Sequence, residues 1–198
     1  MKSEGRGYRQ AARAEATTGN TERIMAAAFE LFVERPFDQI TLPAVAERAG
    51  VGLQTVIRRV GTKDGLVAAV NAWLAPRVAA DGPGAPGNPD PVHVAAAFRR
   101  LYERWALAIE RTLAQAESSP ALAANAASGR AAQRAWLAAT FADALAASPE
   151  PDLLRARLVA VTGVEVWLVL TRHEGLSADQ AEQTLRLLIT ASLEGTPS

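Results

Sequence analysis

The sequence contains no cysteine and only two histidines. Without cysteine there is no disulfide framework, no thiolate metal site and no cysteine nucleophile. His93 and His173 lie far apart in the chain, and neither belongs to a cluster with the spacing of metal ligands. The sequence also has no glycine-rich phosphate loop, serine elbow or paired-carboxylate motif. We therefore expect no metal, no cofactor and no enzymatic activity.

Long apolar runs are missing as well. The longest, Leu158 to Leu170, covers 13 residues and contains Glu165, whereas a helix that crosses a bilayer needs roughly 20 apolar residues. Residues 1–20 are polar and lack the apolar centre of a secretory signal. These features favour a cytoplasmic protein with no membrane partner.

The charges are unevenly distributed, although the net charge over 198 residues is zero. Residues 1–63 contain ten Lys and Arg against seven Asp and Glu, and residues 64–198 contain eleven against fourteen. From Arg48 to Lys63 there are three Arg and one Lys but no acidic residue. A local excess of positive charge indicates an anionic partner, but a difference of this size also arises by chance.

Helical spacing of apolar residues and Ala-rich stretches run through almost the whole chain, of which 49% is apolar. This pattern predicts an all-α fold of about nine helices. In the N-terminal third, Asn20, Thr41 and Thr62 are expected to cap helices, which Pro36 and Gly50 interrupt. The helices predicted there span about residues 20–35, 42–49, 53–60 and 63–78.

A loop rich in proline and glycine, DGPGAPGNPDP at residues 81–91, separates this module from the rest. We expect it to be flexible. Ser119 precedes a proline and is expected to cap a short helix, and Ser177 and Gln180 form a capping box. The C-terminal helices are predicted at about residues 92–117, from 120 onward, and at 130–147, 153–173 and 177–193.

Residues 41–60, TLPAVAERAGVGLQTVIRRV, have the spacing of a helix-turn-helix. Two short helices that cross steeply need a small residue at the crossing, glycine in the turn and an apolar anchor on the second helix. Ala46, Gly50 and Val56 occupy these positions. If Val56 and Val60 point inward, the opposite face of the second helix is available to enter a major groove.

The longer stretch TERIMAAAFELFVERPFDQITLPAVAERAGVGLQTVIRRVGTKDGLVAAV, residues 21–70, resembles the N-terminal DNA-binding domain of the TetR family of transcriptional regulators. The likeness includes FELFVER at the end of the first helix, the AERAGVG turn and the TKDGLV start of the fourth helix. It implies a helix-turn-helix domain at residues 21–66 and a helical regulatory and dimerisation domain at 67–198. Residues 1–20, which come before the first domain, are expected to form a flexible arm.

The residues expected to contact DNA lie on or beside the second helix of the motif. Gln54 suits an adenine edge, Arg58 a guanine edge, and Leu53 and Ile57 suit thymine methyl groups. Arg59, Thr41 and Lys63 are expected to contact phosphates, which position the protein without reading the sequence. The predicted DNA-binding residues are Thr41, Gly52, Leu53, Gln54, Thr55, Ile57, Arg58, Arg59 and Lys63.

The motif departs from the family pattern at several positions. Family members commonly have a small capping residue where Gly52 stands, a polar residue at Leu53 and a tyrosine at Ile57. Exposed Leu53 and Ile57 would indicate either contacts with methyl-rich DNA or a weakened DNA-binding surface. The basic residues of the N-terminal arm, such as Arg6 and Arg9, either reach a minor groove or belong to a solvated tail, and its composition favours the tail.

The resemblance also implies a ligand pocket and a dimer interface in the C-terminal helices. Aromatic side chains with a few polar groups are typical of ligand cavities, although such side chains at helical spacing also form plain cores. The predicted pocket residues are Phe98, Tyr102, Trp105, Trp136, Thr140, Phe141 and Trp167. The predicted homodimer interface comprises Leu158, Val161, Glu165, Leu168, Ala181, Leu185, Leu188 and Ser192.

Together these features predict a dimeric TetR-like repressor that a small molecule releases from a palindromic operator in double-stranded DNA. The alternative is a TetR-like protein with weakened DNA binding that acts as a ligand- or protein-binding module.

Overall fold

The computed structural model describes residues 4–195, with side chains described from Thr18 onward. Every regular element in this range is helical, as the sequence predicts. None of the described helices is both long enough and apolar enough to cross a bilayer. The N-terminal part comprises α1 (Glu4–Glu34), η1 (Phe37–Gln39), α2 (Leu42–Ala49), α3 (Leu53–Val60) and α4 (Lys63–Asp81). The C-terminal part comprises α5 (Pro91–Ala114), η2 (Ala116–Ser118), α6 (Pro120–Thr140), α7 (Ala142–Ala147), α8 (Pro151–Val161), α9 (Val164–Leu168), η3 (Val169–His173) and α10 (Ala178–Glu194).

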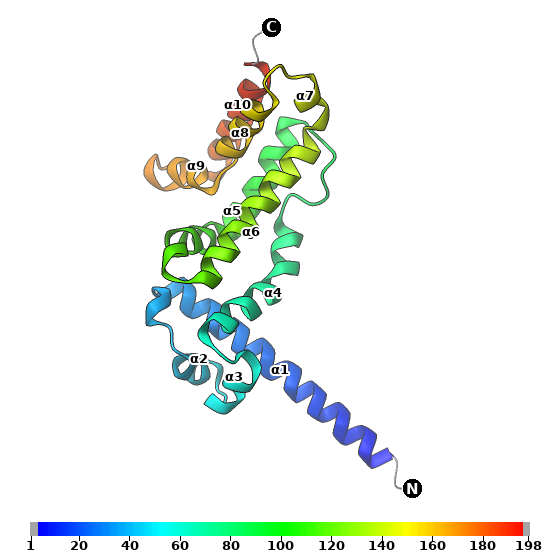
Figure 1. The fold of residues 1–198 in the computed structure, drawn as a ribbon, viewed down its shortest axis with the longest axis vertical. Helices are drawn as coiled ribbons and strands as arrows, with labels where there is room; N and C mark the ends of the chain where they lie inside the picture. The colour runs from blue at the N-terminus through cyan, green and yellow to red at the C-terminus, as the bar shows by residue number, and fades with distance from the viewer. Residues whose placement is uncertain (1–3, 196–198) are drawn as a thin grey trace.

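The two parts are stacked along the long axis of the molecule, and α4 runs from one to the other (Figure 1). In the N-terminal part, α1 packs against α2 and α4, and α2 packs against α3. Apolar side chains from all four helices form one core, which includes Ile24, Met25, Leu31, Val45, Val56 and Leu66. In the C-terminal part, α5 packs against α6, α9 and α10 around a second core that includes Phe98, Leu137, Leu158, Leu185 and Ile189.

The predicted start of the first helix is wrong. The backbone is helical from Glu4, so Asn20 lies inside α1 and its side chain accepts a hydrogen bond from Arg23 at 2.5 Å. The preceding residues are rich in Ala, Glu and Arg, which favour helix and let it continue toward the N-terminus. The contact of the predicted arm with DNA stays a prediction, because the side chains of residues 1–17 lie outside the described part.

The predicted break near Arg130 is also wrong. Helix α6 runs without interruption from Pro120 to Thr140, and the break comes at the buried residue Phe141. A single glycine, Gly129, does not end the helix, because glycine costs only about 1 kcal/mol relative to alanine inside a helix. The predicted cap at Ser119 is confirmed, since its hydroxyl accepts a hydrogen bond from the Leu122 amide.

The predicted single helix at residues 153–173 is divided at Thr162 and Gly163. The Thr162 carbonyl accepts hydrogen bonds from the Tyr102 hydroxyl at 2.5 Å and from the Gln133 amide at 3.1 Å. Because side chains of α5 and α6 satisfy this carbonyl, the chain can leave the helix here without an unpaired buried oxygen. The capping box of Ser177 and Gln180 at the start of α10 is confirmed.

Candidate nucleic-acid interface and adjoining cavity

A short turn holds α2 and α3 in a helix-turn-helix. Thr41 caps α2, as predicted, by accepting a hydrogen bond from the Ala44 amide. Gly50 ends the helix with a φ of 62°, a left-handed conformation that glycine adopts without steric cost. The Val51 amide then donates to the Ala46 carbonyl at 3.0 Å. These contacts set the direction in which the chain enters α3.

Helix α3 has one buried face and one exposed face. Val56 is fully buried and Val60 is 9% exposed, so both anchor the helix on the core. Leu53 is 38% exposed and Ile57 is 37% exposed on the opposite side. Gln54, Arg58 and Arg59 are exposed as well, and Thr55 is half-buried. The structure therefore places the predicted base-contacting side chains on the outward face of α3.

The junction between α3 and α4 is tightly packed. A Cβ atom at Gly65 would overlap the carbonyl oxygen of Val60, the last residue of α3. Thr62 caps α4, as predicted, by accepting a hydrogen bond from the Gly65 amide at 3.0 Å. Close packing at this glycine fixes the end of α3 against the start of α4.

Not all of the local positive charge is available to an anionic partner. Arg48 of α2 forms a bidentate contact with Glu34 of α1, with both nitrogen–oxygen distances at 2.8 Å. The hydrogen bonds from Arg48 hold the pKa of Glu34 below its ordinary value. Lys63 Nζ donates to the Asp38 carbonyl at 3.1 Å and lies 4.3 Å from the Phe37 ring centroid. Helical spacing within α2 or α4 gives no sign of these partners, because they lie on α1 and η1.

Residues 24–70 match the family model described as bacterial regulatory proteins of the tetR family. Over these residues the chain therefore matches the TetR family. The match covers the C-terminal part of α1, η1, α2, α3 and the first part of α4, and thus the whole helix-turn-helix.

Solved structures resemble the whole fold. A transcriptional regulator from Rhodococcus sp. Rha1 superposes with a TM-score of 0.72 and 24% identity, covering 88% of this chain and 96% of that chain. A TetR-like transcriptional regulator from Rhodococcus sp. RHA1 has a TM-score of 0.66 and 21% identity, covering 89% and 96%. No curated protein matches the sequence. The C-terminal helices therefore share the fold of these regulators.

Among the described residues, three polar contacts join residues 24–70 to the C-terminal helices. The Phe37 amide donates to Gln115 Oε1 at 2.6 Å, and Arg111 donates to the Phe32 carbonyl at 3.3 Å. The Ser119 hydroxyl donates to Asp64 at the start of α4 at 3.0 Å. We call Arg111, Gln115 and Ser119 the clasp. Its residues are distant in sequence from the domain they hold, so periodicity along the chain does not indicate them.

A cavity of about 860 Å³ lies where the two parts meet. Its walls come mainly from α1, α4, α5 and α6 and are largely apolar. Of the predicted pocket residues, Phe98, Tyr102, Trp105 and Trp136 line it. The other three do not: Thr140 and Phe141 are buried at the junction of α6 and α7, and Trp167 faces a smaller pocket beside η3.

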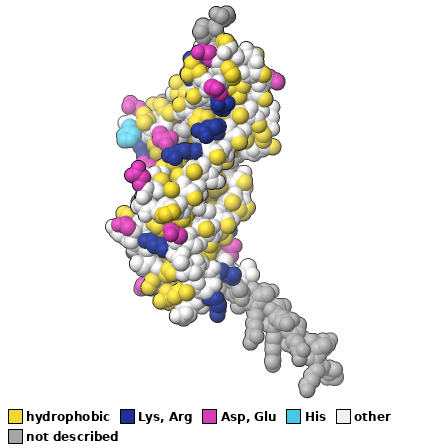
Figure 2. All heavy atoms as spheres, in the orientation of Figure 1, with side chains coloured by type: hydrophobic (Ala, Val, Ile, Leu, Met, Phe, Trp, Pro, Cys, Tyr) yellow, Lys and Arg dark blue, Asp and Glu magenta, His cyan; other side chains and the backbone are white. Residues whose placement is uncertain are grey.

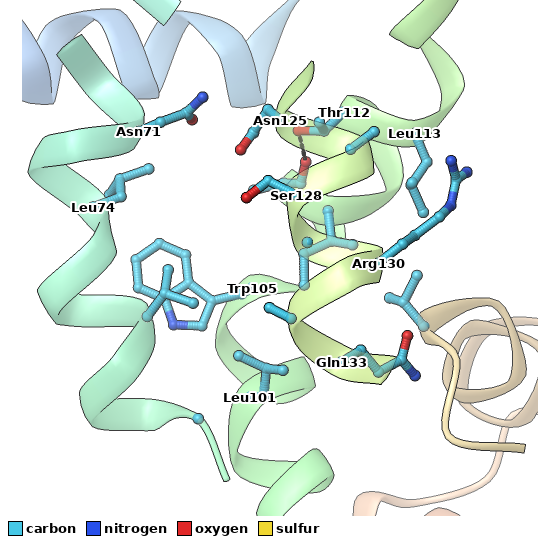
Figure 3. Close-up of a pocket in the computed structure, with 18 of the residues that line it drawn as sticks. Asn71, Leu74, Leu101, Trp105, Thr112, Leu113, Asn125, Ser128, Arg130 and Gln133 are labelled. Atoms are coloured by element: carbon cyan, nitrogen blue, oxygen red, sulfur yellow. Dashed lines mark hydrogen bonds between the residues drawn. The ribbon is translucent and has the colours of Figure 1, made fainter. Parts of the chain in front are cut away.

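The cavity also contains polar side chains that were not predicted from the sequence. Asn71 of α4 and Asn125 of α6 point toward one another across one end, while Arg130 and Gln133 lie farther along α6 (Figure 3). Trp105 donates to Asp81 at the end of α4, and Trp136 donates to the Gly84 carbonyl in the loop that follows, each at 3.0 Å. Polar residues dispersed over several helices carry no spacing that marks them as one site.

Much of the predicted dimer interface is buried within one subunit, where it packs against that subunit's own helices. The buried residues are Leu158, Leu168, Ala181, Leu185 and Ser192. The α10 residues among them face the core shared with α5 and α8, and Arg99 of α5 secures α10 through Asp179 and Glu182 at 2.5 and 2.8 Å. Val161, Glu165 and Leu188 retain exposed surface.

Proposed function

We propose that this protein is a DNA-binding transcriptional regulator, acting as a dimeric repressor that a small molecule releases from its operator. The observation that carries the proposal is the outward face of α3. Within a TetR-family domain, this face presents Gln54 and Arg58 beside Leu53 and Ile57, and α3 contains no acidic residue. A helix with this face fits a major groove about 12 Å wide.

In this proposal, side chains on the outward face of α3 read bases, while other residues on and beside α3 contact phosphates. Gln54 pairs with an adenine edge and Arg58 with a guanine edge. Thr41 and Arg59 contact the backbone. Gly52 starts α3 without a side-chain cap, which leaves amide groups of the first turn for a phosphate. Lys63 keeps two of its three N–H donors after its bond to the Asp38 carbonyl, so a phosphate contact remains compatible with its position.

Exposed leucines on α8 and α10 support the dimer. Leu153 is 43% exposed on α8, and Leu187 and Leu188 are 57% and 37% exposed on α10. Large apolar side chains that one subunit leaves exposed on adjacent helices suit a self-complementary twofold interface. These outward residues, rather than the buried face of α10, are our proposed contact with a second copy. Such a dimer would present two α3 helices to successive turns of a palindromic site.

The cavity suits a largely apolar, uncharged effector that carries a few hydrogen-bonding groups. Asn71 and Asn125 offer amide donors and acceptors at one end of mainly apolar walls. Since α4 lines the cavity and its first residues pack against α3, a ligand that favours another position of α4 would change the orientation of α3. The loss of operator affinity can be no larger than the difference between the ligand's affinities for the DNA-binding state and for the state with α4 displaced.

The test is DNA affinity as a function of salt for the wild type, Arg58→Ala and Arg134→Ala. Both substitutions remove one exposed arginine, but Arg134 lies on α6, away from α3. We expect wild-type affinity to fall steeply with salt. Arg58→Ala should lower the preference for the specific duplex over random DNA by about 1–3 kcal/mol, and Arg134→Ala should leave it unchanged.

An absence of specific binding by the wild type, even at low salt, would contradict the proposal. It would instead support a TetR-like ligand- or protein-binding module without an operator.

A further inference from the structure

We infer that Leu53 and Ile57 read thymine through its 5-methyl group, so that each operator half-site contains two thymines at defined positions in contact with α3. The inference rests on the proposed function, and it adds the chemistry by which the operator is recognised. It concerns the apolar half of the outward face of α3, which we call the methyl-reading stripe and define as Leu53 and Ile57.

The stripe is not required by the core of the protein. The other large apolar side chains of α3, Val56 and Val60, are the ones that anchor it. Leu53 and Ile57 are four residues apart and therefore lie on the same side of the helix, one turn from each other. Hydrophobic side chains gather at the lower end of the molecule, over α2 and α3 (Figure 2). The exposure of Leu53 and Ile57 is unfavourable in water unless a partner covers these side chains.

The charge around the stripe favours DNA over an apolar protein surface. Helix α3 has no acidic residue, and its last turn contains Arg58 and Arg59. These cations suit a polyanion and would have to lose water at an apolar protein interface. Within a major groove, the apolar group at the base edges is the thymine methyl, whereas the other groups there are hydrogen-bond donors and acceptors. The stripe therefore has one complementary partner on duplex DNA.

The helix geometry also sets the spacing of the two thymines. Four residues advance about 6 Å along an α-helix, and base pairs are stacked about 3.4 Å apart. The two methyl groups should therefore lie about two base-pair steps apart, on either strand. Gln54 and Arg58 follow Leu53 and Ile57 directly in sequence, so the bases they read should neighbour the thymines.

The test begins with selection of bound duplexes from random DNA by the full chain. Each thymine of the enriched duplex is then replaced singly by deoxyuridine, which removes only the 5-methyl group and preserves base pairing. We expect about fourfold weaker binding at two positions in each half-site, since burial of one methyl-sized group contributes about 0.8 kcal/mol. Replacement at the other thymines should change the affinity little.

Variants assign each methyl contact to its side chain. Leu53→Ala should abolish the thymine-to-uracil difference at one of the two positions, and Ile57→Ala should abolish it at the other. Val92→Ala is the matched control, because Val92 is an exposed apolar residue at the start of α5, in the C-terminal part. It should leave both differences intact. Both α3 side chains are on the surface, so the variants should fold normally.

Two outcomes would overturn the inference while leaving the proposed function in place. One is specific binding that no uracil replacement weakens. The other is a change of oligomeric state in Leu53→Ala or Ile57→Ala with the uracil effect unchanged, which would make the stripe a protein interface. If no duplex is enriched at all, the proposed function itself fails. The two failures are therefore distinguishable.

Discussion

At the scale of single residues, Tyr102 links the cavity to the packing of the C-terminal helices. It lines the cavity and is 5% exposed, and its hydroxyl donates to the Thr162 carbonyl, where α8 ends. Burial, with a smaller effect of the Glu165 carboxylate, raises the pKa of Tyr102 well above its ordinary value. The folded protein therefore keeps this hydroxyl protonated.

The raised pKa predicts a loss of stability at alkaline pH. Above about pH 10 a tyrosine in the unfolded chain releases its proton while folded Tyr102 retains it, so rising pH favours unfolding by up to about 1.4 kcal/mol per pH unit. Below that pH the contribution of Tyr102 to stability is fully present. Urea unfolding at about pH 8 and pH 11 measures the effect. Tyr102→Phe should cost about 1 kcal/mol at the lower pH and remove part of the alkaline loss. Equal alkaline losses in both proteins would contradict this account.

The exposure of a side chain could be predicted where it follows helix periodicity. The contact of a side chain with a residue on another element could not. Val56 and Val60 point inward and Leu53 and Ile57 outward, as their spacing predicts. The pairing of Arg48 with Glu34 depends on how α1 crosses α2, and the bond of Lys63 to Asp38 depends on where η1 lies. Neither the crossing of α1 and α2 nor the position of η1 is encoded in the spacing of residues along one helix.

At the scale of elements, the position of α3 depends on its contact with the start of α4. Gly65 lies against the Val60 carbonyl at a separation that leaves no room for a Cβ atom. Backbone atoms of Val60 form this contact, so a side-chain rotation cannot relieve a clash. The absence of a side chain at residue 65 is thus a condition for the observed packing of α3.

Gly65→Ala should therefore destabilise the protein by about 1–3 kcal/mol, the usual cost of forcing an extra methyl group into a packed site. Gly129→Ala is the matched control, since Gly129 lies inside α6 and a methyl group there would have no neighbouring atom within 4 Å. It should stabilise the protein by about 0.5–1 kcal/mol. Thermal unfolding of the two variants checks both signs. A neutral Gly65→Ala would mean that α3 and α4 are not tightly coupled.

Many helix ends could be predicted from local features of the sequence, whereas the division of residues 153–173 could not, because it depends on tertiary contacts. Thr41, Gly50, Thr62 and Ser177 act within a few residues of their own helix ends, and each acts as expected. The division of the last long apolar segment at Thr162 depends instead on hydrogen bonds from α5 and α6. Local propensity contains no information about those donors.

At the scale of the whole molecule, the clasp and α4 are the two connections that bear on the orientation of α3. Gln115 and Ser119 hold η1 and the start of α4 from the C-terminal side. The cavity lies between these contacts and the rest of the C-terminal core, with α4 as one wall. A ligand there would act on the helix that packs against α3. This arrangement agrees with regulation of DNA binding by occupancy of the cavity.

In the proposed complex α3 docks in the major groove twice per dimer. Guanine N7 lies in that groove, so protection of N7 from dimethyl sulfate measures this docking. On the enriched duplex we predict two protected patches about 34 Å apart, one helical turn. Arg58→Ala should restore reactivity at one guanine in each patch. A duplex that is bound specifically while every guanine N7 remains reactive would contradict the account.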